Sequence, residues 1–252
     1  MAVKKKKRRS SAQVRKEAVI TDGCNPEFVE GARWSGTLEI PIIEKPEKIA
    51  IPSGFVPFSQ AGRVLPGRFA VCEYENDRDF ADLLRDPASY VKELRRFQAF
   101  VTPDASLYWD APLAAQIVNK YRNHAIGHYM QKRGIYTIPN VRWGDERTYT
   151  DCALPEPLAF LGVEKGSIVS IGSYGVVRTK LEKYHFRAGL DAMLGYLEPE
   201  VVLVYGTMPE DVFGDFEDRT EFVRYPDWTT YVREDSTELK GGTFADAEEA
   251  SS

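Results

Sequence analysis

Three groups of polar residues follow apolar runs of the sequence, at positions where buried strands would end. The run "FVT" leads into "PDASLYWDAP", "YTIP" leads into "NVRWGDE", and "SIVSIG" leads into "SYGVVR". Asp104, Asp145 and Glu146 are carboxylates in these segments, and carboxylates coordinate Mg²⁺ and exchange protons with substrates. We therefore predict that these three residues are catalytic, either by holding a divalent metal such as Mg²⁺ or Mn²⁺ or by serving as acid and base.

Cationic and aromatic side chains in the same segments could bind the substrate. Arg142 and Arg178 can hold an anion through paired hydrogen bonds, and Trp143 and Tyr174 can stack on a ring. The sequence therefore predicts a site for a nucleotide-like small molecule. The remaining predicted ligand-binding residues are Tyr108, Asp110, Ser173 and Tyr205.

Structural roles could also explain several of these residues. Asp110 precedes "APL", where Asp is a favoured helix N-cap, and Asp104 could cap a turn. Asp145 and Glu146 could form a solvated pair in a loop, and Tyr174 could pack on a neighbouring loop. These structural roles stay open beside the functional ones.

His124 and His128 stand four residues apart in a helical pattern, so they could share one helix face. Their segment "HAIGH" lacks the glutamate of the HExxH zinc motif. We therefore interpret the two histidines as partly buried helix residues rather than metal ligands.

Alternating strands and helices would position the polar segments. Strands that alternate with helices are typical of βαβ units with a parallel sheet. We predict an α/β fold whose mainly parallel sheet has about six strands and flanking helices. The sheet would form an incomplete TIM-like barrel or, alternatively, a doubly wound open sheet. In both arrangements ligands bind at the carboxyl ends of the strands, so the polar segments would share one rim. The predicted strands begin at Phe69, Phe97, Tyr136, Ser167, Val201 and Glu221, and the predicted helices lie within 77–97, 111–134, 185–200 and 209–218.

Composition divides the chain of 252 residues into four parts. Residues 1–20 form a basic tail and residues 233–252 an acidic tail, and we expect both tails to be disordered. Residues 21–67 are rich in Pro and Gly and predict an extended segment that wraps the domain, with "LEIPII" as an edge strand. Residues 68–232 form the α/β domain.

Charge limits the partners of this domain. Residues 1–16 hold eight Lys or Arg and no acid, whereas residues 17–232 hold 23 basic and 32 acidic residues, a net charge of −9. Such a domain is not a general polyanion binder. The tail could add weak, salt-sensitive affinity for nucleic acid, or it could serve only to keep the protein in solution.

The remaining composition indicates a cytoplasmic protein that does not enter a membrane. No apolar stretch approaches the roughly 20 residues that cross a bilayer, and no apolar signal segment follows the basic start. Three widely spaced cysteines form neither a disulfide framework nor a zinc motif, which is typical of a reducing compartment.

Several longer stretches resemble a family of uncharacterised proteins from bacteria, their phages and mobile elements, which is classed as a domain of unknown function. They are "VTPDASLYWDAPLAAQIVNKYRNHAIGHYMQKRGIYTIPNVRWGDERTY", "KGSIVSIGSYGVVR" and "LEPEVVLVYGTMPEDVFG". The likeness covers about residues 50–226. It implies a phage or mobile-element origin, with the cytoplasm of the host cell as the setting if a phage encodes the protein.

The resemblance supplies no reaction, so the function is predicted from the residues. The first hypothesis is a metal-dependent hydrolase or nuclease-like enzyme that acts on an anionic, nucleotide-like substrate. A second is a nucleic-acid-associated accessory protein without catalysis. A third is a protein that sequesters a nucleotide at the same rim.

Overall fold

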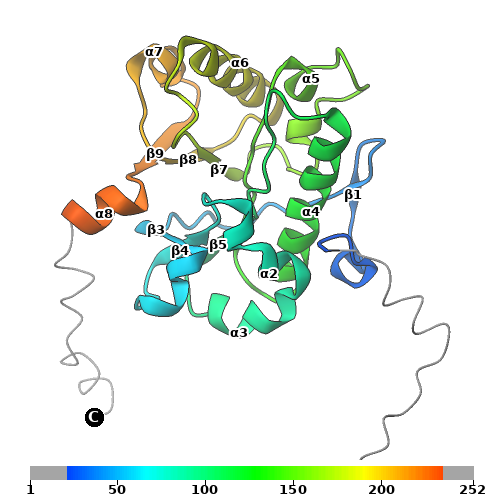
Figure 1. Cartoon of the computed structure of the whole chain (residues 1–252), viewed down its shortest axis with the longest axis vertical. Helices are drawn as coiled ribbons and strands as arrows, with labels where there is room; N and C mark the ends of the chain where they lie inside the picture. Colours follow the sequence, from blue (N-terminus) through cyan, green and yellow to red (C-terminus); the bar gives the residue numbers. More distant parts are fainter. Residues whose placement is uncertain (1–21, 235–252) are drawn as a thin grey trace, which may run out of the picture.

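The computed structural model describes residues 22–234, so the predicted basic tail and nearly all of the acidic tail lie outside the described residues. Within this part, two parallel sheets follow one another in chain order (Figure 1). A parallel bridge between Asn140 and Ser170 links them. The first sheet contains β3 (Gly54–Pro57), β4 (Phe69–Cys72), β5 (Ala99–Val101) and β6 (Thr137–Ile138), and the second contains β7 (Ile168–Gly172), β8 (Val201–Tyr205) and β9 (Glu221–Tyr225).

The strands of both sheets share one inner core. Side chains alternate between the two faces of a strand, so every second residue points inward. β9 and β3 lie close together at this core, because the rings of Tyr225 and Phe55 stack with 4.7 Å between their centroids. The Tyr225 hydroxyl also donates a hydrogen bond of 2.5 Å to the Pro52 carbonyl. The inward-facing cluster includes Phe55, Ala70, Cys72, Ala99, Val101, Ile138, Ile168, Leu203, Tyr205 and Tyr225.

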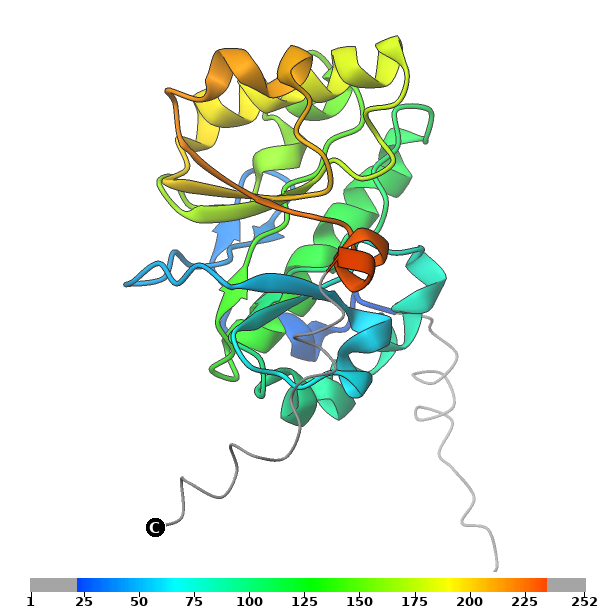
Figure 2. The same ribbon diagram turned by 90° about the vertical axis from the view of Figure 1, so that its left-hand side faces the viewer.

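Helices cover the outer faces of the strands (Figures 1 and 2). Outward residues of the first sheet, such as Val71 and Phe100, pack on Leu83 and Ile126 of the covering helices. Outward residues of the second sheet pack on α6 and α7 in a separate cluster. The helices are α2 (Ala81–Arg85), α3 (Val91–Leu94), α4 (Leu113–Gln131), α5 (Glu146–Tyr149), α6 (Lys180–Leu197), α7 (Glu210–Phe213) and α8 (Trp228–Glu234).

Short elements complete the fold. The pair β1 (Trp34–Ser35) and β2 (Ile40–Pro41) is antiparallel, and β2 packs against α4. The 3₁₀ helices are η1 (Pro26–Val29), η2 (Phe58–Arg63), η3 (Asp77–Asp79), η4 (Pro87–Tyr90), η5 (Leu158–Phe160) and η6 (Gly214–Phe216).

The predicted α/β fold with a mainly parallel sheet is confirmed, and each of the six predicted strands is present. The strand order has no reversal, which a doubly wound sheet would require, so it favours the incomplete barrel. No hydrogen-bonded ladder joins β9 to β3 within residues 22–234. The sequence missed β3, which lies inside the segment 21–67. Its apolar run is short and ends at Pro57, which is tolerated because β3 is an edge strand.

Trp143 fixes the position of α6 against the segment that follows β6. Its indole Nε1 donates a hydrogen bond of 3.2 Å to the His185 carbonyl, and its ring lies 5.2 Å from that of Phe186. Gly189 permits this contact, because a Cβ at Gly189 would lie 2.2 Å from the indole nitrogen. The absence of a side chain at Gly189 therefore determines how closely α6 approaches.

The substitution Gly189→Ala is expected to destabilise the protein by about 1–3 kcal/mol, because the new methyl group overpacks the contact with Trp143. Gly195→Ala is the matched control in the same helix. Its Cβ would meet no atom closer than 3.7 Å, so alanine is expected to stabilise by about 0.5–1 kcal/mol. Urea unfolding of both variants measures the difference, and equal effects would contradict this packing.

Candidate functional site

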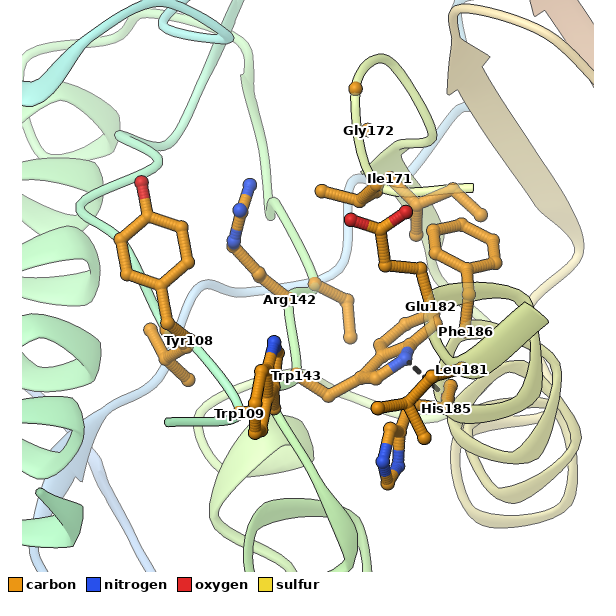
Figure 3. Close-up of a pocket in the computed structure, with 15 residues that line it drawn as sticks. Tyr108, Trp109, Arg142, Trp143, Ile171, Gly172, Leu181, Glu182, His185 and Phe186 are labelled. Carbon is orange, nitrogen blue, oxygen red and sulfur yellow. Dashed lines mark hydrogen bonds between the residues drawn. The ribbon is translucent and has the colours of Figure 1, made fainter. Parts of the chain in front are cut away.

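A cleft lies at the carboxyl ends of the parallel strands, as the strand-end argument predicts. It consists of two adjoining cavities of about 180 Å³ and about 300 Å³. Both are lined by Tyr108 from the loop after β5, Arg142 from the segment after β6, and Gly172 and Gly175 from the end of β7 and its loop. Figure 3 shows Tyr108 and Trp109 on one wall, the α6 side chains on the other, and Arg142 between them.

A buried ion pair forms the base of the cleft. Arg142 Nη1 lies 2.6 Å from Asp104 Oδ2, and the other carboxylate oxygen accepts a hydrogen bond of 2.7 Å from Asn140 Nδ2. Asn140 Oδ1 in turn accepts a hydrogen bond of 3.1 Å from the Tyr74 hydroxyl, which also lies 2.6 Å from Ser170 Oγ. The network thus joins the ends of β4 and β7 with the segments after β5 and β6.

Burial and the ion pair act in opposite directions on Asp104. Burial raises the pKa of the Asp104 carboxyl above its usual value, and the Arg142 charge and the Asn140 hydrogen bond offset only part of this rise. An arginine stays protonated in proteins, so the carboxylate has a permanent cationic partner. Asp104 is only 5% exposed, and both of its oxygens are engaged. The side chain therefore anchors Arg142.

Arg142 keeps hydrogen-bonding capacity for a ligand. Among the described residues its side chain donates only through Nη1, which leaves the Nη2 donors for a ligand, whereas Nε is buried. The guanidinium also lies 5.6 Å from the centre of the Tyr108 ring. Two carboxylates that line the cleft already accept hydrogen bonds: Glu75 accepts them from Ser59, and one oxygen of Glu182 accepts them from the backbone before α6. Arg142 is the lining cation with donors left for a ligand.

Aromatic side chains surround this cation. Tyr108, Trp109 and Tyr174 are each 51% exposed although they are large and mostly apolar. Trp143 and Phe186 are buried at the back of the smaller cavity. The smaller cavity, with aromatic walls and few polar groups, is typical of a small-molecule site, whereas the larger one is lined mostly by polar side chains.

The other two predicted catalytic residues lie apart from the cavity linings. Asp145 is the N-cap of α5, accepts from the Arg147 backbone N–H, and forms an ion pair of 2.8 Å with the Arg147 side chain. Glu146 is solvent-exposed, and its Oε2 lies 3.9 Å from His185 Nδ1. The structure brings neither residue together with Asp104, so their catalytic roles stay predictions without a shared site.

Four of the predicted ligand-binding residues also lie outside both cavity linings. Asp110 is exposed in a turn, and the N-cap of α4 is Pro112. Ser173 is buried and donates a hydrogen bond of 2.6 Å to the Thr207 carbonyl. The last two are Arg178, whose side chain is exposed, and Tyr205, whose hydroxyl accepts a hydrogen bond of 2.8 Å from the Trp228 backbone N–H.

Sequence reasoning missed several lining residues. Trp109 lies between two residues that were predicted, and a tryptophan in a polar loop was a usable signal. Tyr74 follows the strand that ends in Cys72, where the strand-end rule also applies. Glu182 lies in the first turn of α6, where no sequence pattern marked it; His185 follows in the same helix, and from the sequence it could equally be a ligand contact or a helix cap.

The described residues contain no group of three His, Cys, Asp or Glu side chains that could hold a metal ion. Asp104 and Asp145 each have an arginine partner, and Glu146 lies near a histidine instead of another carboxylate. These donors do not fit the predicted Mg²⁺ or Mn²⁺ site, because such ions need several oxygen ligands in one place.

The fold and the cleft define an α/β protein with a mainly parallel sheet and an aromatic, arginine-containing cleft at its strand ends. The chain belongs to the family described as domain of unknown function DUF4417, whose model matches residues 32–226. This family confirms the resemblance seen in the sequence. No solved structure matches the chain.

Phage proteins are among its relatives. The chain is 32% identical over 133 residues to the Gene 1 protein of Mycobacterium phage D29, an alignment that covers 53% of this chain and 47% of that protein. It is 31% identical over 159 residues to the Gene 1 protein of Mycobacterium phage L5, covering 62% and 66% of the two chains. The aligned part is therefore less than two thirds of each relative. None of the described helices is long and apolar enough to cross a membrane.

Glu73 is a second buried acid near the cleft. It follows β4, is 1% exposed, and neither of its carboxyl oxygens has a hydrogen-bond partner. Burial raises the pKa of this carboxyl well above its usual value, and the charges of Glu75 and Asp104 raise it further. An ionised Glu73 therefore destabilises the folded state.

The substitution Glu73→Gln is expected to raise the melting temperature at pH 7–8. The pKa of Glu73 is higher in the folded state than in the unfolded state. Below the unfolded pKa of about 4.3 the carboxyl is neutral in both states, so it does not reduce the free energy of unfolding. As the pH rises from there towards the folded pKa, the wild type loses stability. The gain should reach a few degrees, since about 1 kcal/mol shifts Tm by ~2–4 °C in a domain of this size.

Thermal unfolding of wild type and variant between pH 4 and pH 8 tests this expectation. Glu217→Gln, at an exposed glutamate, is the control and should change Tm little at any pH. A Glu73→Gln gain that stays constant over this range would contradict a buried, neutral carboxyl.

Proposed function

We propose that the cleft binds a small, anionic molecule with a flat ring, of which a nucleotide is the best match. The observation that carries this proposal is Arg142, which stands at the junction of two cavities with Tyr108 beside it. An arginine with open N–H groups suits a phosphate or carboxylate, and exposed aromatic rings suit a base.

The hydrogen-bonding pattern of the lining, rather than its net charge, supports an anionic ligand. Asp104, Glu75 and Glu182 already accept hydrogen bonds from neighbouring protein groups, whereas Arg142 keeps donors that no described residue occupies. Arg142 is held by Asp104 through one nitrogen, so its orientation is fixed before a ligand arrives. Such preorganisation lowers the entropic cost of binding.

Binding without a reaction fits the cleft better than metal-dependent hydrolysis does. The carboxylates predicted to be catalytic are separated, and the described residues offer no cluster of metal ligands. A protein that sequesters a nucleotide requires only the cation and the aromatic walls. An accessory role at nucleic acid would use the basic residues 1–16, which lie outside the described residues, and it stays a prediction from charge.

A thermal-shift panel of mononucleotides is expected to raise the melting temperature, because a ligand that binds only the folded state stabilises it by mass action. Arg142→Lys should weaken binding by about tenfold or more, since it keeps the charge but loses the planar pair of donors. Arg78→Lys is the matched control, because the Arg78 side chain is 84% exposed.

Tyr108→Leu provides an independent variant that keeps both members of the ion pair, and it should lower affinity by removing a stacking surface. Tyr184→Leu is its control, since Tyr184 is 65% exposed and lines neither cavity. The proposal is wrong if no nucleotide shifts the wild type, or if the Arg142 and Tyr108 variants bind as the wild type does.

A further inference from the structure

The cleft is divided into two subsites that share one cation. The smaller subsite is the cavity of about 180 Å³ that lies against α6, and the larger is the cavity of about 300 Å³ that lies against Tyr74 and Asp104. The first is smaller than the ~300–1,000 Å³ typical of small-molecule sites, whereas the two together fall within that range. The residues common to both are Tyr108, Arg142, Gly172, Gly175 and Val176.

Each subsite has its own exposed aromatic side chain. Trp109 lines only the smaller subsite and Tyr174 only the larger, and both are 51% exposed. Tyr108, with the same exposure, lines both subsites and lies beside Trp109 in Figure 3. A flat ring in either subsite therefore has a stacking surface, and stacking contributes about 1–3 kcal/mol per base.

The shared residues leave the junction open. Gly172 has no side chain there, and a Cβ at this position would meet the Tyr74 ring at 2.7 Å. Gly175 has a φ of +79°, which L side chains rarely adopt. Among the described residues, two basic side chains line these cavities. His185 lines the smaller cavity, and Arg142 lines both.

From this arrangement we infer that the ligand has two flat rings joined by a single anionic group, which is the chemistry of two nucleosides linked by one phosphodiester. Arg142 binds the phosphodiester, and the two bases occupy the two subsites beside Trp109 and Tyr174. This inference rests on the proposed function and specifies its ligand. A single nucleotide fills one subsite and leaves the other empty.

The test compares ligands that carry the same charge. A dinucleoside monophosphate has one phosphodiester and two bases, whereas the methyl ester of a nucleoside 5′-monophosphate has one phosphodiester and one base. Isothermal titration calorimetry measures the affinity of each ligand type in its adenine, guanine, cytosine and thymine forms, because the structure does not specify the base. We expect the best dinucleoside monophosphate to bind at least about fivefold more tightly than its methyl ester, since the second stacking contact is worth about 1–3 kcal/mol.

Two variants assign the subsites. Trp109→Ala and Tyr174→Ala should each reduce the affinity for the dinucleoside monophosphate to near that of the methyl ester, while only one of them should affect the methyl ester. Both side chains are half exposed, so these changes are expected to preserve the fold. Val118→Ala, at an exposed residue of α4 that lines neither subsite, is the control.

The outcomes separate the two proposals. If the methyl ester binds and the dinucleoside monophosphate binds no more tightly, the two-subsite inference is wrong and the proposed function stands. The inference is also wrong if Trp109→Ala and Tyr174→Ala both bind the dinucleoside monophosphate as tightly as the wild type does. If no ligand of either kind binds, both proposals fail.

Discussion

The buried ion pair between Asp104 and Arg142 is the interaction on which the cleft depends. Taking charges out of water is costly, so a buried carboxylate and guanidinium persist only when they face each other and their remaining polar atoms have partners. Asn140 supplies a further hydrogen bond to the carboxylate, and Tyr74 and Ser170 extend the network to β4 and β7. Segments that are distant along the chain are therefore held at one end of the sheet by a single polar cluster.

Two buried apolar neighbours anchor the segment that carries Arg142. Val141 and Trp143 belong to the hydrophobic cluster beneath α6, whereas Arg142 between them pairs with Asp104. All three residues line the smaller cavity, so the apolar packing of Val141 and Trp143 holds the arginine at the cleft. Gly189 then lets α6 close on Trp143 and form the opposite wall.

The elements and the end of the sheet at which the cleft lies could be predicted from the sequence, whereas the pairing of side chains could not. Apolar runs separated by helical patterns indicated the strands, and the rule for parallel sheets brought Tyr108, Arg142 and Tyr174 to one rim. Asp145 looked like Asp104 in sequence, yet it caps its own helix and pairs with Arg147 two residues later. Such partners depend on side-chain geometry that no pattern of residue types encodes, and the N-cap signal at Asp145 was weak because α5 has only four residues.

A double-mutant cycle at Asp104 and Arg142 tests the central claim most directly. Each alanine variant alone leaves a buried charge without its partner and is expected to lose about 3–5 kcal/mol of unfolding free energy. The double variant should lose clearly less than the sum, with a coupling energy above ~1 kcal/mol measured by urea unfolding. Losses that add to within about 0.5 kcal/mol would contradict the account, since they would mean that the two side chains do not depend on each other.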